Sequence, residues 1–262
     1  MIPHQNKILR SLIIAGLIAL ITCAVMLILL STNGFKDGVF SKKATAEEDF
    51  SLPSRLQKTP DYGQFYVDNM IFIGDQTIAP IRSSAILRNG ADTKQIWTGE
   101  KGSLSLDYSL STSTIVYPES AQSITLAEAI SLKRPDHVVI TLGFENGVAY
   151  CTEEKFKEYY GSIISVIKES SPDTKIILQS IFPVSDKKQK DDSGITNEKI
   201  DRANLWIEEL ANDNSVRYLH TASVLKDSKG NLNSDYDSGN GVTLNEAGYR
   251  KMLEYIRTHG YK

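Results

Sequence analysis

Three short polar segments of this 262-residue chain carry the residue types that could do chemistry. They are residues 74–77 (GDQT), 143–147 (GFENG) and 237–244 (DSGNGVTL). Amides, hydroxyls and carboxylates exchange hydrogen bonds with sugar hydroxyls, and a carboxylate can also activate water. The segments therefore predict a polar binding site or a hydrolytic site. The candidate ligand-binding residues are Asp75, Gln76, Glu145, Asn146, Asn240 and Thr243.

Two of the candidate side chains have competing interpretations. Asp75 can brace the loop in which it lies, which is the simpler role, or it can bind a sugar hydroxyl. His220, at the end of an apolar run, is either a half-buried strand-end histidine or a catalytic base. The other histidines are placed away from the polar segments by their positions in the chain; they are His4, His137 and His259.

The elements that position these segments are visible as two kinds of hydrophobic pattern. Strand-length apolar runs cover residues 70–74, 137–142, 175–180 and 216–219. Helical periodicity covers residues 152–167, 200–210 and 245–258. Thr152 is a suitable N-cap for the first helix, and Glu153 and Glu154 are favourable in its first turn.

Continuous apolar strands alternating with helices predict the fold class. We expect an α/β domain with a single doubly wound, mostly parallel sheet and helices on both faces, in a flavodoxin-like three-layer arrangement. The ligand site of such a sheet lies outside the carboxyl ends of its strands. We expect all three polar segments to meet at that rim.

Composition excludes several classes of function. The chain has 29 Lys and Arg residues against 32 Asp and Glu, and this net charge of −3 gives no basic stripe for nucleic acid. Cys23 and Cys151 are too few for a disulfide framework, and no CxxC motif or Cys/His cluster has metal-ligand spacing. We therefore expect no metal, no cofactor and no nucleic-acid partner.

The N-terminal region contains a candidate membrane anchor. Residues 11–30 (SLIIAGLIALITCAVMLILL) lack any charge and are long enough to cross a hydrocarbon core as a helix. The nearest small-x-small site, at residues 44–46, lies far beyond this run, which argues against a cleaved signal peptide. Acylation at Cys23 is disfavoured because the apolar run continues after it.

The expected organisation has four parts. Residues 1–10 form a short tail, 11–30 a transmembrane helix, 31–60 a stalk of mixed charge, Gly, Ser and Pro, and 61–262 the α/β domain. Lysines and arginines flank both ends of the span, so charge alone does not orient it.

The polar segments and their surroundings resemble the SGNH (GDSL-like) hydrolase family, in a membrane-anchored bacterial branch. The resemblance rests on IFIGDQT (71–77), ITLGFEN (140–146) and DSGNGVTL (237–244), and extends through IILQSIFPVS (176–185) over residues 61–261. It implies an SGNH-hydrolase-like fold, acyl-transfer chemistry on esters and a single-pass membrane protein with its domain outside the cell. In the family, a serine nucleophile works with a histidine and an aspartate, and a backbone N–H, a glycine and an asparagine form the oxyanion hole.

The chain departs from the family pattern at each of these positions. Gln76 stands at the nucleophile position, and Asn240 and Thr243 stand where the aspartate and histidine belong. Gly102 matches the oxyanion glycine, with Gly99 as an alternative register. Glu145 occupies the asparagine position, where a carboxylate opposes a developing oxyanion.

These substitutions favour a domain that is inactive as a serine esterase and whose former active-site cleft binds a cell-envelope glycan or another polar ligand. The first alternative is an active esterase or deacetylase acting on acylated carbohydrate through a rearranged site of Glu145, Asp75 and His220. The second is a protein-interaction module of the cell envelope, for which the charged run 186–192 is a weak candidate surface.

Overall fold

A computed structural model describes residues 52–144, 146–191 and 193–261 of the chain. These residues belong to a compact unit that runs from Ser51 to Lys262. The expected tail, transmembrane helix and most of the expected stalk lie outside the described residues. Within the described ranges, none of the helices has both the length and the apolar character required to span a bilayer.

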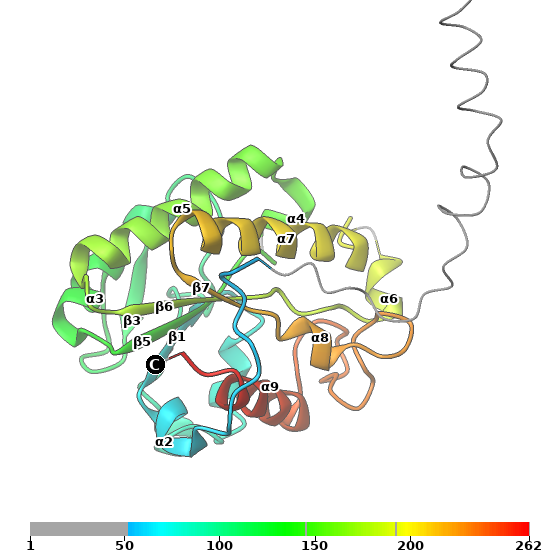
Figure 1. Ribbon diagram of the computed structural model, residues 1–262, viewed down its shortest axis with the longest axis horizontal. Coiled ribbons are helices and arrows are strands. Elements are labelled where there is room, and N and C mark those ends of the chain that lie inside the picture. Colours follow the sequence, from blue (N-terminus) through cyan, green and yellow to red (C-terminus); the bar gives the residue numbers. More distant parts are fainter. Residues whose placement is uncertain (1–51, 145, 192, 262) are drawn as a thin grey trace, which may run out of the picture. The chain divides into compact units, whose positions relative to one another are not determined.

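The centre of the unit is a parallel five-stranded sheet (Figure 1). Its order is β2 (Ile96–Trp97), β1 (Met70–Gly74), β5 (His137–Thr141), β6 (Lys175–Gln179) and β7 (Arg217–Leu219). All residues of β1 and β5 are buried, as the continuous apolar runs predict. The short edge strand β2 was not among the predicted strands, because two residues are too few to show a pattern.

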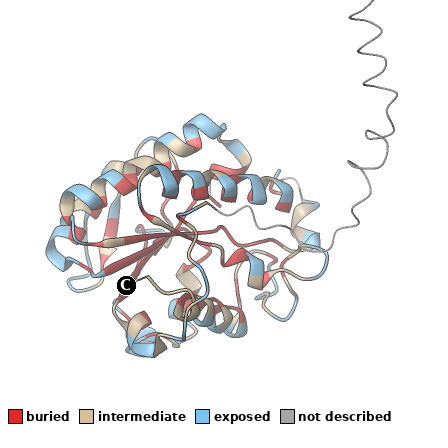
Figure 2. Cartoon of the chain, in the orientation of Figure 1, coloured by how far each residue is buried: buried red, intermediate tan, exposed pale blue. Residues whose placement is uncertain are grey.

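Helices cover both faces of the sheet, which confirms the α/β fold with its three layers (Figure 1). On one face lie α3 (Leu126–Lys133), α5 (Glu153–Ser170) and α7 (Asn197–Asp213). On the other lie α2 (Gly63–Asp68), α8 (Ala222–Leu225) and α9 (Glu246–Thr258). Alternate strand residues serve the two cores, and Figure 2 shows the resulting buried sheet between helices with exposed outer sides.

Side-chain caps define where the long helices begin. The Oγ1 atom of Thr152 accepts a hydrogen bond from the backbone N–H of Lys155 (3.3 Å), so the predicted N-cap of α5 is confirmed. Thr196 caps α7 in the same way, and Asn245 caps α9 through the N–H of Gly248 (3.0 Å). Each cap satisfies a backbone donor that the helix leaves unpaired.

Shorter elements connect these layers. The antiparallel hairpin β3 (Thr114–Tyr117) and β4 (Gln122–Thr125) lies between β2 and α3 in the sequence. Its burial is uneven, which explains why no simple alternation revealed it. The remaining short helical turns are η2 (Ala79–Arg82), η3 (Gly90–Asp92), η4 (Leu110–Thr112), α4 (Gly147–Tyr150) and α6 (Asp186–Gln189).

The segment before α2 is part of the fold. Arg55 forms a parallel bridge with Tyr218, so this segment extends the sheet beside β7. The buried carboxylate of Glu208 pairs with the Arg55 guanidinium (2.6 Å) and accepts a hydrogen bond from the N–H of Leu52 (3.0 Å). The compact unit consequently begins before the boundary expected at residue 61, because a polar, pattern-free segment docks through backbone pairing and one ion pair.

Candidate functional site at the carboxyl ends of β1 and β5

The carboxyl ends of β1 and β5 form the switch point of the sheet. β1 pairs with β2 on one side and with β5 on the other, and Gly74 is in register with Thr141. A Cβ atom on Gly74 would lie 2.3 Å from the carbonyl oxygen of Thr141, so the close approach of the strands requires glycine. Ligands of doubly wound sheets bind at such a point.

Asp75 holds the two strand-end loops together. Its Oδ1 atom accepts hydrogen bonds from the backbone N–H (3.0 Å) and hydroxyl (2.6 Å) of Thr77, and its Oδ2 atom accepts one from the N–H of Phe144 (3.0 Å). The residue is only 1% exposed. Its carboxylate therefore braces the loops, the simpler of its two expected roles, and is not presented to solvent.

Two buried tyrosines lie within electrostatic reach of Asp75. Burial, followed by the negative charge of Asp75, raises the pKa of Tyr160 far above its usual range. Burial also raises the pKa of Tyr249, with the Asp75 charge as a smaller cause. The Tyr249 hydroxyl donates to the carbonyl oxygen of Thr77 (2.7 Å), so both tyrosines are protonated structural donors at neutral pH.

Gln76, at the nucleophile position of the family, is exposed at the end of β1. Its backbone N–H donates a hydrogen bond to the Oγ atom of Ser103 (3.0 Å). Gly102 precedes Ser103 in the same loop with a φ of +77°, and the loop is tied to β1 by the N–H of Leu104 and the carbonyl oxygen of Gly74 (3.2 Å). The structure thus brings Gln76 together with the loop that carries Gly102.

The loop after β5 forms the second part of the site. Gly143 has a φ of +112°, and a Cβ atom there would lie 2.8 Å from the ring of Phe156. Asn146 is exposed, in a left-handed conformation, directly before α4. Glu145, the candidate between them, lies outside the described residues.

The third polar segment, residues 237–244, is closed by its own side chains. The Oδ1 atom of Asn240 accepts hydrogen bonds from the N–H groups of Val242 and Thr243 (both 2.9 Å). The Asn240 amide nitrogen donates to the Thr243 hydroxyl (2.9 Å), which also shares a hydrogen bond with the hydroxyl of Ser238 (2.7 Å). The residues at the family's aspartate and histidine positions therefore contact each other.

Hydrogen bonds place this segment and the helix that follows it at the same rim. The carbonyl oxygen of Gly241 accepts a hydrogen bond from the N–H of Ser185, in the segment after β6 (2.9 Å). A second hydrogen bond is that of the Tyr249 hydroxyl, which links the start of α9 to the loop after β1. The three polar segments therefore border the same end of the sheet, as expected from the strand order.

His220 lies at the same end of the sheet but on a distant strand. It follows β7, which is separated from β1 by β5 and β6, a lateral distance of about 14 Å at the usual strand spacing. Its Nδ1 atom is 3.0 Å from the hydroxyl of Tyr218. Burial, helped by the positive charges of Arg55 and Lys226, lowers the pKa of His220. The structure does not bring His220 together with Asp75.

Other titratable candidates lie outside the polar rim. His137 begins β5 at the opposite end of the sheet, where its Nε2 atom contacts the carbonyl oxygen of Tyr261 (2.7 Å). His259 stacks on Tyr255 in the C-terminal tail. Among the residues that the structure describes, no group of three or more His, Cys, Asp or Glu side chains could hold a metal ion.

Sequence reasoning missed two residues of the site, Ser103 and Tyr249. Ser103 follows the candidate Gly102, but nothing in a short Gly/Ser loop distinguishes the serine that meets Gln76. Tyr249 has the spacing of a core residue of α9, and it is fully buried; only the structure shows that its hydroxyl reaches Thr77.

Comparisons with known proteins agree with this architecture. The sequence profile of the GDSL-like Lipase/Acylhydrolase family matches residues 105–251, more than half of the chain. The chain therefore belongs to this family. The matched region includes residues 143–147 and 237–244 and begins after the loops that carry Gln76 and Gly102. No protein with a curated description matches the chain significantly.

Several solved structures match the chain. A Streptococcus pneumonia protein provisionally described as a platelet activating factor matches with a TM-score of 0.51 and 18% identity, covering 72% of this chain and 82% of that one. An acetylxylan esterase from Geobacillus stearothermophilus matches with a TM-score of 0.44 and 16% identity, over 74% and 94% of the chains. A peptidoglycan O-acetylesterase matches with a TM-score of 0.41 and 14% identity, over 50% and 38%. The first of these likenesses shows an SGNH-like α/β fold.

Proposed function

We propose that this chain is a member of the GDSL-like family that has lost serine-esterase chemistry and binds a glycan at the former active site. The observation that carries the proposal is the hydrogen bonding of Asn240 with Thr243. An asparagine amide and a threonine hydroxyl cannot accept a proton near neutral pH. Here the Asn240 side chain instead forms hydrogen bonds with the hydroxyl and the backbone N–H of Thr243 in the same loop. The amide of Gln76 is not a nucleophile.

The environment of Gln76 supports the same proposal. In the family a backbone N–H belongs to the oxyanion hole. Here the N–H at the nucleophile position, that of Gln76, donates to Ser103. A tetrahedral intermediate would have to displace the serine hydroxyl to obtain this donor. Removal of one oxyanion donor typically slows acyl transfer by a factor of roughly 100 to 1,000.

The chemistry of the exposed groups indicates the ligand class. Gln76, Asn146 and Asn240 are exposed at the rim and carry neutral amides. Neutral donors and acceptors suit the hydroxyls of a sugar, whereas an anionic ligand would call for a cluster of arginines or lysines. We propose a polysaccharide of the cell envelope, acylated or not, as the ligand.

The N-terminal segment supports a location at the cell membrane. We propose that residues 11–30 form a single-pass membrane anchor with the N-terminus inside and the α/β domain outside the cell. The uncharged run of twenty residues supports this proposal. Proteolysis of intact cells tests it: the domain should be degraded from outside, and protection of the domain until the cells are lysed would contradict it.

An esterase assay tests the loss of serine chemistry. The full-length chain is compared with the variant Gln76→Ser/Asn240→Asp/Thr243→His, using p-nitrophenyl acetate and acetylated xylan. We expect no turnover by the wild type and measurable turnover by the variant. The matched control, Gln76→Ala/Asn240→Asp/Thr243→His, lacks the nucleophile and should be silent. Turnover by the wild type that disappears in Glu145→Ala or His220→Ala would overturn the proposal in favour of a rearranged active esterase.

A further inference from the structure

A second recess adjoins the site, in the long connection between β2 and β3. Residues 99–114 form a pocket of about 490 Å³ beside Gln76. Hydroxyl groups dominate its lining, which includes Ser103, Ser105, Ser109 and Thr112. Lys101 and Asp107 contribute one charge of each sign, so the pocket has no net charge from its lining.

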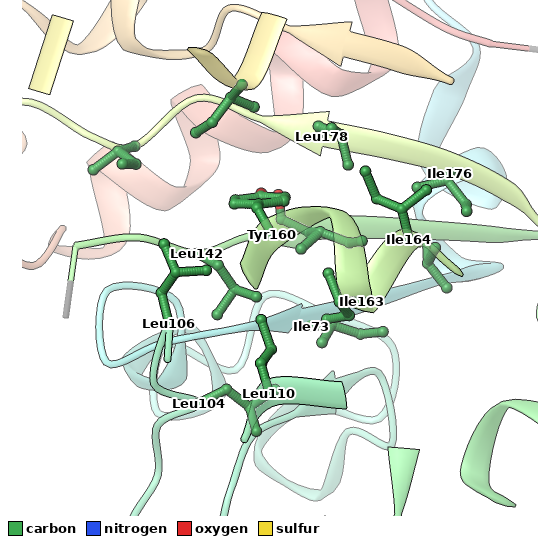
Figure 3. Close-up of a cluster of buried hydrophobic side chains, with 14 of the residues drawn as sticks. Ile73, Leu104, Leu106, Leu110, Leu142, Tyr160, Ile163, Ile164, Ile176 and Leu178 are labelled. Atoms are coloured by element: carbon green, nitrogen blue, oxygen red, sulfur yellow. The ribbon is translucent and has the colours of Figure 1, made fainter. Parts of the chain in front are cut away.

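The connection is fixed to the core by alternate leucines. Leu104, Leu106 and Leu110 are at most 3% exposed and pack near Leu142 and Tyr160 (Figure 3). Ser105, Asp107 and Ser109, which lie between these leucines, are partly exposed and line the pocket. The pocket therefore has a rigid floor although it is built on a loop.

Tyr108 lies on the turn between Leu106 and η4. Its side chain points away from the leucines and is 84% exposed. The turn that carries it is held by Asp107, whose Oδ1 atom accepts hydrogen bonds from the N–H (2.8 Å) and hydroxyl (2.6 Å) of Ser109. A tyrosine ring offers an apolar face and a hydroxyl tip, a combination that suits contact with a sugar.

Tyr150 provides a second exposed ring on the neighbouring loop. It is the last residue of α4 and is 78% exposed. The two loops touch, because Leu106 packs against Gly147 at the start of α4. In addition, the charge of Asp107 contributes, after burial, to a raised pKa of Cys151. Tyr108 thus follows Asp107, and Tyr150 precedes Cys151, the two groups that interact electrostatically.

The pocket also contains polar groups that the protein itself does not satisfy. Within the described part of the chain, the Ser105 hydroxyl and the Lys101 ammonium have no hydrogen-bond partner, and both residues line the pocket. Ser103 lines it as well and accepts the hydrogen bond from Gln76, so the pocket is continuous with the former nucleophile position. Free donors next to exposed aromatic rings suit a ligand with both hydroxyls and C–H faces.

We propose that this pocket, together with Tyr108 and Tyr150 on the two adjoining loops, is a subsite for an uncharged polysaccharide chain that extends from Gln76. The proposal rests on the glycan-binding function proposed above, and it adds the path that the bound polysaccharide follows over the surface. Pyranose rings present their C–H faces to the tyrosine rings and their hydroxyls to Ser105 and Lys101. The balanced charge of the pocket disfavours a polyanionic glycan.

Calorimetric titration of the full-length chain in mild detergent tests the subsite. The neutral probes are xylohexaose, cellohexaose and chitohexaose, and hexagalacturonate is the anionic probe. We expect at least one neutral probe to bind more tightly than the anionic one. Tyr108→Ala and Tyr150→Ala should each weaken its binding about three- to tenfold. Tyr108→Phe and Tyr150→Phe should keep wild-type affinity, because the ring remains. Phe65→Ala, which removes an equally exposed ring from α2, is the matched control and should change nothing.

The variants separate this inference from the function on which it rests. Unchanged affinity in the tyrosine variants, together with weaker binding in the cleft-filling variant Gln76→Trp, would overturn the subsite and leave the proposed function standing. The opposite pattern would support the subsite and contradict binding at the former active site. If none of the four probes binds the wild type, both proposals are wrong.

Discussion

The loop after β1 and the loop at residues 237–244 are each held in shape by one side chain, but the two side chains are of opposite kinds. The loop after β1 is organised by Asp75, a buried carboxylate that accepts hydrogen bonds from two loops. The loop at residues 237–244 is organised by Asn240, an exposed amide that bonds only to its own neighbours. The Asp75 side chain thus joins two loops, whereas the Asn240 side chain makes its hydrogen bonds within its own loop.

This difference explains how a family frame can persist while its reactive groups change. Replacing a buried acceptor leaves unpaired N–H groups in the interior, whereas water can replace the partners of an exposed amide. The fold therefore restricts position 75 far more than positions 76, 240 or 243. We therefore expect the largest effect from a change at the buried carboxylate and smaller effects from changes at exposed groups.

The largest effect is expected at Asp75. Asp75→Ala removes the acceptor of three hydrogen bonds in the interior and should lower the free energy of unfolding by about 3–5 kcal/mol. Urea unfolding followed by circular dichroism measures this loss. Asp235→Ala, which removes an exposed carboxylate, should change stability by less than about 0.5 kcal/mol. Equal stability of the two variants would contradict the bracing role.

A catalytic effect is expected at Ser103 once the triad is restored. In the background Gln76→Ser/Asn240→Asp/Thr243→His, the additional change Ser103→Ala frees the N–H of residue 76 to donate to an oxyanion. Hydrolysis of p-nitrophenyl acetate should rise about tenfold or more. Ser105→Ala, two residues away in the same loop, is the control and should leave the rate unchanged. A rate that falls with Ser103→Ala would show that its hydroxyl does not block the donor.

A smaller effect is expected at Asn240. Asn240→Ala removes the acceptor for the N–H groups of Val242 and Thr243 and should cost about 1 kcal/mol of stability, because both groups are near solvent. Asn240→Asp retains the acceptor and should be almost neutral. Hydrogen exchange at Thr243 should accelerate in the alanine variant only. A loss as large as that of Asp75→Ala would remove the contrast between the loops.

The smallest effect is a pH dependence from His220. Burial and the nearby Arg55 and Lys226 lower its pKa in the folded protein, so the unfolded chain binds a proton more readily. This stabilising contribution is present above a pH of about 6.5 and is lost as the pH falls toward the folded pKa. The urea midpoint should therefore decrease between pH 7.5 and 5.5, and less steeply in His220→Gln. Parallel curves for the two proteins would contradict the depressed pKa.

Much of the fold could be predicted from the sequence, because its central strands are uniformly apolar. Strands at 70–74, 137–142, 175–180 and 216–219 and the capped helix after Thr152 leave an unambiguous hydrophobic pattern, and all appear in the structure. β2 was not predicted because its two residues are too few to show a period, and the β3–β4 hairpin was not predicted because β4 contains no buried residue. The same limit explains why the docked segment around Arg55 was expected to be stalk.

The candidate site could be located from the sequence but not assembled. The parallel direction of the strands places residues 74–77, 143–147 and 237–244 at one rim, and a bracing role for Asp75 was one of its two expected roles. The hydrogen bond from Gln76 to Ser103 and the exposure of Tyr108 depend on how a loop packs, and the sequence pattern of that loop gives no sign of either. The distance of His220 from β1 depends on strand order, which the sequence does not state.

The docked segment beside β7 also has a mechanical consequence. A pull on the chain that precedes residue 52 is met first by the pairing of Arg55 with Tyr218 and by the ion pair with Glu208. These contacts lie on the edge strand, three strands away from β1. Tension in the chain before residue 52 would therefore enter the domain at this edge of the sheet, and not at the loops around Asp75 and Gln76.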